Sequence, residues 1–99
     1  MSAYVATKAA AIGLTRSLAR ELGHRRIRVN TISPGWIMTD RQLSDHVTPA
    51  VKRQIRREQC IPDLNQPDEV AAVALFLASD SSRAVTGQEI LVDLGWVPG

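Results

Sequence analysis

The sequence is poor in cysteine and in long apolar runs, and each shortage excludes a class of protein. The single cysteine, Cys60, excludes an internal disulfide and a cysteine cluster around a metal. It is typical of a chain that works in the reducing cytoplasm. No run of about eighteen apolar residues occurs, so no membrane-spanning helix is expected. We therefore expect a cytoplasmic protein without a metal site and without a membrane partner.

The sequence also lacks an excess of charge of either sign. Against 12 Lys and Arg residues stand 10 Asp and Glu residues, so the formal net charge is only +2. A field of that size is too weak to hold nucleic acid. The short basic segment at residues 24–28 is best interpreted as a solvated turn, because an apolar residue that begins a strand interrupts it. No nucleic-acid partner is predicted.

The composition and the sequence pattern are typical of a layered α/β protein with small aliphatic side chains in its core. Hydrophobic residues are 44% of the 99 and aromatic residues only 4%, which describes an Ala, Val, Ile and Leu core between helices and a sheet. At this length the chain is one small domain with little stability to spare. Periodicity predicts, in order, a helix over residues 2–23, a strand over 27–32, a loop and lid over 33–61, a helix over 67–80 and a strand over 88–94.

Helix boundaries carry their own signals. Gly23 is expected to end the first helix in the left-handed conformation. Pro49 begins a short amphipathic helix within the lid, reaching about Gln59. Pro67 followed by the acidic Asp68 is typical of the start of the next helix, because a carboxylate interacts favourably with the positive end of the helix dipole.

Two residues of the first helix have side chains that could act together. Tyr4 and Lys8 lie four positions apart, so both project from one helix face. A phenol is a poor acid or base near neutral pH because its reference pKa is about 10, but a neighbouring ammonium favours the phenolate. On spacing alone, chance placement on a helix surface is the better interpretation, because such short motifs arise often.

Four longer blocks change that balance. They are YVATKAAAIGLTRSLARELG, RIRVNTISPGWIMT, DEVAAVALFLASD and TGQEILVDLGW. In order, spacing and residue type they resemble the short-chain dehydrogenase/reductase family, and the resemblance covers nearly the whole chain. It implies an α/β fold in which this chain supplies the C-terminal part of a Rossmann-type, doubly wound parallel sheet, from the YxxxK helix onward.

The resemblance also assigns roles to individual residues. Tyr4 matches the family's catalytic acid/base, which exchanges a proton with a carbonyl or alcohol oxygen while hydride moves to or from the nicotinamide of NAD or NADP. Lys8 matches the partner that makes the phenol more acidic and binds the nicotinamide ribose. The family's loop that holds the nicotinamide carboxamide and a nearby phosphate is matched by Pro34, Gly35, Ile37 and Thr39. Glycine there would let the backbone come close to the cofactor.

Residues 36–60 match the family's substrate-covering lid. The lid residues expected to meet the substrate are Trp36, Arg41 and Gln42. Lid and C-terminus look most like members that oxidise sugars and other polyols, and a 3-oxoacyl carrier-protein reductase is the alternative within the family. Trp96 is expected at a subunit interface, because members of this family commonly form tetramers, so the partners predicted are a small-molecule alcohol or carbonyl and further copies of the chain.

Departures from the family pattern limit what the chain is expected to do alone. The family's glycine-rich pyrophosphate turn, its NAD- or NADP-selecting residue, its catalytic serine and an earlier asparagine are not among the 99 residues. The sequence therefore predicts a truncated chain that is inactive by itself. A non-catalytic fragment that associates with itself or with a relative is the alternative, and a misplaced start codon is another. Leu94 stands where the family commonly has glycine.

Overall fold

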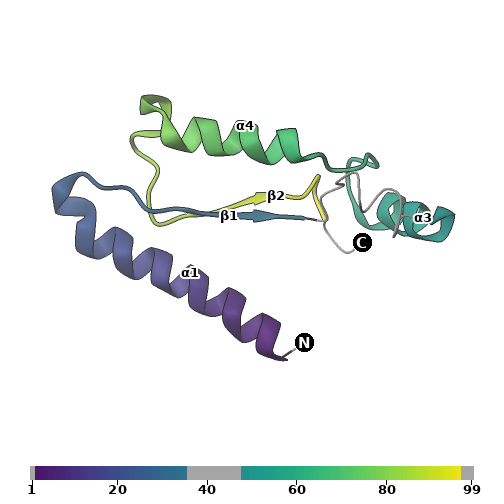
Figure 1. The fold of residues 1–99 in the computed structure, drawn as a ribbon, viewed down its shortest axis with the longest axis horizontal. Helices are drawn as coiled ribbons and strands as arrows, with labels where there is room; N and C mark the ends of the chain where they lie inside the picture. Colours follow the sequence, from purple (N-terminus) through teal and green to yellow (C-terminus); the bar gives the residue numbers. More distant parts are fainter. Residues whose placement is uncertain (1, 36–47, 97–99) are drawn as a thin grey trace. The chain divides into compact units, whose positions relative to one another are not determined.

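The computed structural model describes residues 2–35 and 48–96 of the chain. The elements follow in the order α1 (Ser2–Leu22), a 3-10 turn (Gly23–Arg25), β1 (Thr31–Pro34), α3 (Pro49–Glu58), α4 (Pro67–Ala78), a second 3-10 turn (Asp80–Ser82) and β2 (Glu89–Val92) (Figure 1). β1 and β2 pair in a two-stranded sheet although α3 and α4 separate them in sequence. The predicted α/β class is confirmed.

The strand pair is parallel, as its hydrogen bonds show. The amide of Thr31 donates to the carbonyl of Gln88 at 2.9 Å, and the amide of Gly35 donates to the carbonyl of Val92 at 3.0 Å. Both partners advance by four residues in the same direction, which is the register of parallel strands. Two compact units share these elements, one joining the chain up to Ile32 with residues 74–90 and the other joining residues 33–73 with the chain from Leu91.

The first helix ends later than its glycine suggested. Gly23 was expected to be the left-handed residue, but the helix continues there as a 3-10 turn and the left-handed residue is Arg26, at φ 61°. The amide of Arg26 donates to the carbonyl of Gly23 at 2.9 Å, and that of Ile27 donates to the carbonyl of Leu22 at 3.3 Å. These bonds satisfy the last carbonyls of the helix, so the prediction for Gly23 is wrong by three residues.

The first strand also begins later than predicted. Residues 27–32 were expected to form it, whereas β1 spans Thr31–Pro34. The preceding residues pair partly through side chains: the amide of Val29 donates to Oγ1 of Thr86 at 3.1 Å, while its carbonyl accepts from the backbone amide of Gly87 at 2.8 Å. Asn30 donates to one carbonyl of the facing segment at 3.0 Å and accepts from one of its amides at 3.1 Å. Because side-chain groups take these bonds, the regular ladder starts only at Thr31.

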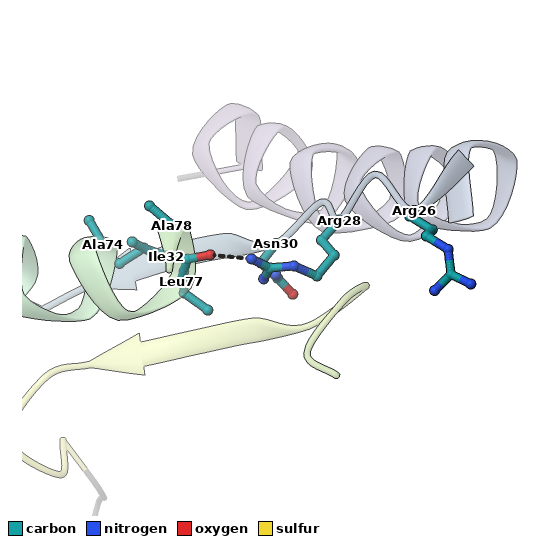
Figure 2. A pocket seen from close by; sticks show the side chains of 7 residues that line it. All are labelled: Arg26, Arg28, Asn30, Ile32, Ala74, Leu77 and Ala78. Carbon is teal, nitrogen blue, oxygen red and sulfur yellow. Dashed lines mark hydrogen bonds between the residues drawn. The ribbon is translucent and has the colours of Figure 1, made fainter. Parts of the chain in front are cut away.

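Arg28 holds the C-terminal end of α4. Its guanidinium donates to the carbonyls of Leu77 at 2.9 Å and Ser79 at 3.2 Å, and to Oγ of Ser82 at 2.9 Å. Figure 2 shows the Arg28 side chain reaching the carbonyl of Leu77. Ser82 is buried, with 1% of its surface exposed. An arginine thus caps the last carbonyls of a helix that has no basic residue in its own last turn.

Hydrogen bonds more than apolar contacts hold residues 48–73 and 91–96. Ile55 is the only buried hydrophobic side chain in the described ranges, with 2% exposed. Gln59 Nε2 donates to the carbonyls of Ile61 at 3.0 Å and Asp63 at 2.9 Å. Trp96, expected at a subunit interface, is half-buried and pairs with Gln59 in an isolated antiparallel bridge. The second unit therefore depends on a few satisfied polar groups.

The turn after β2 explains why glycine suits position 94. Leu94 has φ 57°, in the left-handed region that disfavours a side chain, and Gly95 follows at φ 75°. The carbonyl of Leu94 accepts from the amide of Ile61 at 3.0 Å, and Oδ1 of Asp93 accepts from the amide of Gly95 at 2.9 Å. This bonding holds the turn in a conformation that Leu94 adopts only with strain.

Replacing Leu94 with glycine should raise the free energy of unfolding by about 1 kcal/mol. The left-handed conformation costs a side chain roughly 1–2 kcal/mol, and the greater freedom of glycine in the unfolded chain offsets part of that gain. Urea unfolding of the chain measures the change. The matched control is Leu91→Gly in β2, where glycine only loosens a strand and should lower stability. A lower midpoint for Leu94→Gly would contradict the assigned strain.

Candidate active site

Tyr4 and Lys8 lie one turn apart on the same face of α1, as the spacing predicted. Tyr4 is 65% exposed, and Lys8 is exposed as well. Within residues 2–35 and 48–96, neither side chain forms a hydrogen bond or an ion pair. The phenolic hydroxyl and the ammonium are both available to a ligand, which is what a shared catalytic role requires.

Thr15 fixes the helix face that carries this pair. It follows Tyr4 and Lys8 by eleven and seven residues, so the three side chains belong to one stripe of α1. Thr15 is the buried residue of the helix, at 8% exposed. Its hydroxyl donates to the carbonyl of Ala11 and also forms a hydrogen bond with Oγ1 of Thr31 in β1. This contact sets the rotation of α1 about its own axis.

Sequence reasoning missed Thr15 and Thr31. A threonine is a poor helix former, and its place among apolar residues of a helix was the available signal. A buried hydroxyl needs a partner, and Thr31 is the first residue of the following strand. The two threonines are therefore positioning residues for the face that bears Tyr4 and Lys8.

Pro34 and Gly35 lie where β1 ends. A Cβ on Gly35 would stand 2.8 Å from Cβ and 3.0 Å from Cα of Asp93, closer than such atoms approach. Glycine is therefore required at position 35 because the chain passes close to residue 93, which follows β2. Five further residues named from the sequence lie outside the described part of the chain: Trp36, Ile37, Thr39, Arg41 and Gln42.

The exposed pair fits the nicotinamide end of NAD or NADP. A nicotinamide ribose offers hydroxyls to an ammonium, and a carbonyl or alcohol oxygen beside it needs a group that can give and take a proton. Lys8 and Tyr4 are such groups, and both lack a competing partner in the part of the chain that the structure describes. The 99 residues contain no glycine-rich turn for the pyrophosphate.

A hollow of about 480 Å³ lies within the first unit. Arg26, Arg28, Asn30 and the α4 residues Ala74 and Leu77 are among its walls (Figure 2). The guanidinium of Arg28 is already engaged by backbone carbonyls, and Asn30 bonds the facing segment. Its polar walls are therefore structural, and neither Tyr4 nor Lys8 lines it.

Neither a cluster of metal ligands nor a membrane-spanning helix occurs among the described residues. No group of three or more His, Cys, Asp or Glu side chains among the described residues is placed to hold a metal ion. Over residues 2–35 and 48–96, no helix combines the length and the apolar character that crossing a membrane requires.

Comparison with known proteins gives a family model and many relatives. The model, described as enoyl-(acyl carrier protein) reductase, matches residues 1–97. A probable short-chain type dehydrogenase/reductase of Bradyrhizobium diazoefficiens is 40% identical over 95 residues, which are 96% of this chain and 34% of that protein. D-xylose 1-dehydrogenase of Caulobacter vibrioides is 45% identical over 93 residues, 94% of this chain and 37% of that enzyme. The chain spans about a third of the length of these curated relatives.

Solved structures agree with the fold. A 4-hydroxyisoleucine dehydrogenase mutant complexed with NADH and succinate superposes with a TM-score of 0.87 at 37% identity, over 96% of this chain and 39% of that one. A 3-oxoacyl-[acyl-carrier protein] reductase from Brucella melitensis superposes with a TM-score of 0.82 at 46% identity, over 93% of this chain and 34% of that one. The predicted Rossmann-type α/β fold is confirmed by these likenesses.

Proposed function

The chain belongs to the short-chain dehydrogenase/reductase family, and from that premise we propose that it serves the NAD(P)-dependent interconversion of a secondary alcohol and a carbonyl compound. The observation that carries the proposal is the pair Tyr4 and Lys8, exposed on one face of α1 without a partner among the described residues. The reaction needs a nucleotide-binding segment in addition to these 99 residues, as the glycine-rich turn is not among them.

In the proposed reaction the side chains of this chain handle the proton. A bound nicotinamide supplies or takes up the hydride. During reduction, Oη of Tyr4 gives its proton to the carbonyl oxygen while the carbonyl carbon gains the hydride; during oxidation, the alcohol oxygen gives its proton to Oη. Nζ of Lys8 binds the ribose hydroxyls, and its charge stabilises the phenolate. Thr15 and Thr31 keep both groups on the working face of α1.

A sugar or another polyol is the substrate class that we favour. The likeness to D-xylose 1-dehydrogenase, at 45% identity, supports it. A 3-oxoacyl carrier-protein reductase is the alternative within the family, supported by the Brucella melitensis structure at 46% identity. The NADH in a solved relative supports NAD as cofactor, with NADP as the alternative. We assign substrate contact to Trp36, Arg41 and Gln42, and carboxamide contact to Ile37 and Thr39.

Association between copies of the chain is a second proposal, and it rests on exposed apolar side chains. Leu75 and Phe76 of α4 are 72% and 45% exposed, and Leu91 of β2 is 59% exposed. Contiguous exposed apolar surface is typical of a protein interface, and Leu75 and Phe76 are neighbours in α4. We propose a homo-oligomer, in the cytoplasm in view of the single Cys60. A non-catalytic fragment that only associates is the competing proposal.

A chimaeric enzyme tests the catalytic proposal. The 99 residues replace the matched C-terminal third of D-xylose 1-dehydrogenase from Caulobacter vibrioides, and nucleotide oxidation or reduction is followed at 340 nm with D-xylose and with a 3-oxoacyl thioester. We expect turnover by the chimaera and none by the 99-residue chain or by the remaining segment alone. A folded chimaera that binds NADH and converts neither substrate, together with a defined oligomer of the chain in light scattering, would favour the association role instead.

A further inference from the structure

One face of α3 is strongly basic and fully presented to solvent. Four of its ten residues are cations with exposed side chains, namely Lys52, Arg53, Arg56 and Arg57. The opposite face holds the helix in place through Ile55, which is 2% exposed, and through the half-buried Val51. The burial of one face therefore fixes the direction in which the cations point.

No carboxylate among the described residues pairs with these cations. Over residues 2–35 and 48–96, none of the four forms an ion pair or a side-chain hydrogen bond. Lys52 and Arg56, like Arg53 and Arg57, stand four residues apart, a spacing at which like charges destabilise a helix. Arg56 and Arg57 near the C-terminal end gain from the helix dipole, but Lys52 and Arg53 lie nearer its positive end. Helix stability does not account for the pattern.

Two of the four cations line a hollow. It measures about 230 Å³, and its walls are Lys52, Ile55, Arg56, Pro62, Asp63 and Leu64. The carboxylate of Asp63 thus faces the same space as the two cations without pairing with either of them. Arg53 and Arg57, on the neighbouring stripe of the helix, do not line it.

Hydrogen bonds fix the part of the hollow's wall that residues 62–64 form. Gln59 Nε2 donates to the carbonyls of Ile61 and Asp63, at 3.0 and 2.9 Å. Asn65, which follows the hollow's last residue, is 1% exposed and donates from Nδ2 to the carbonyl of Val92 at 2.8 Å. A hollow whose backbone wall is fixed in this way is preformed, so a ligand that enters it loses little by ordering the protein.

We propose that this hollow binds a phosphorylated polyol, with the phosphate on Lys52 and Arg56 and a ligand hydroxyl donating to the carboxylate of Asp63. Two cations suit the dianionic charge and several acceptor oxygens of a phosphate group. The carboxylate repels the phosphate but accepts from a hydroxyl, so it selects a ligand that carries both. The residues of this site include neither Tyr4 nor Lys8, so the inference goes beyond the proposed function and does not rest on it.

Calorimetric titration of the 99-residue chain with glycerol 3-phosphate, inorganic phosphate and glycerol tests the site. We expect saturable binding of glycerol 3-phosphate, weaker binding of inorganic phosphate and none of glycerol. Equal affinities for glycerol 3-phosphate and inorganic phosphate would overturn the polyol assignment. Absence of saturable binding of glycerol 3-phosphate up to about 10 mM would overturn the site itself. Neither result depends on the chain's turnover, so the proposed oxidoreductase function is tested separately.

Matched variants distinguish a specific binding site from nonspecific electrostatic attraction between the basic helix and an anion. Lys52→Gln and Arg56→Gln should each weaken glycerol 3-phosphate binding about tenfold, because each removes a charge-assisted hydrogen bond. Arg53→Gln and Arg57→Gln remove the same charge from the same helix and should change affinity less than about twofold. Asp63→Ala removes the acceptor for the ligand hydroxyl and should abolish the preference for glycerol 3-phosphate over inorganic phosphate. Equal losses in all four cation variants, with unchanged circular dichroism, would show that no specific site exists.

Discussion

Replacing Tyr4 with phenylalanine should lower the turnover number of the chimaeric enzyme about 10³-fold and leave its affinity for NADH within about twofold. Phenylalanine keeps the ring and removes only the hydroxyl, and a positioned general acid or base contributes roughly 10²–10⁴-fold to a rate. Because the Tyr4 side chain is 65% exposed and makes no hydrogen bond to the described residues, its loss should not disturb folding. Steady-state rates and NADH fluorescence titration measure the two quantities.

Two other cations of α1 extend this experiment, Lys8 as a second test of the pair and Arg16 as the control. Lys8→Met removes the ammonium from the same face and should reduce both turnover and NADH affinity, because the proposed role of Lys8 includes the ribose. Arg16→Gln removes one positive charge from another exposed position of α1 and should change neither by more than about twofold. If the Tyr4→Phe enzyme kept more than about a tenth of the original rate, the acid/base role would have to be abandoned.

The shared helix face of Tyr4 and Lys8 could be predicted because it depends only on local geometry. Tyr4 and Lys8 share a face of α1 once the helix forms, and residues 2–22 are mostly strong helix formers. The same holds for α3, whose start at Pro49 the sequence indicated, since Thr48 caps it and accepts from the amide of Val51 at 3.2 Å. Signals within a few residues decide both elements.

What the sequence did not predict depends on distant partners. The regular part of β1 starts at Thr31 because Val29 and Asn30 bond residues more than fifty positions later. The Thr15 and Thr31 contact joins α1 to β1 across sixteen positions, and the sequence around Thr15 does not indicate which residue is its partner. The end of the first helix was missed for a similar reason. Its left-handed residue is Arg26 and not Gly23, because two additional backbone hydrogen bonds extend the helix. Propensity is overridden wherever such tertiary bonds form.

Replacing Arg28 with methionine should lower the free energy of unfolding of the chain by about 2–3 kcal/mol. Methionine keeps the apolar stem and removes a guanidinium that bonds three carbonyls and a buried hydroxyl. Each hydrogen bond to a charged group is worth roughly 1.5–3 kcal/mol, and water that replaces the guanidinium offsets part of the sum. The groups that would lose this donor are the carbonyls of Leu77, Ser79 and Val85 and the hydroxyl of Ser82.

Urea unfolding and amide hydrogen exchange locate this effect. The amides of Arg83 and Val85, which donate to the carbonyls of Asp80 and Ser82 at 3.2 and 2.8 Å, should exchange faster in Arg28→Met, because the turn after α4 loses its anchor. Arg25→Met removes the same charge from an exposed position and should change stability by less than about 0.5 kcal/mol. Arg28→Lys should fall between them, since an ammonium cannot reproduce the planar fork. Equal losses of stability for the variants of residues 25 and 28 would mean that the lost positive charge alone, and not the anchoring of α4, explains the effect.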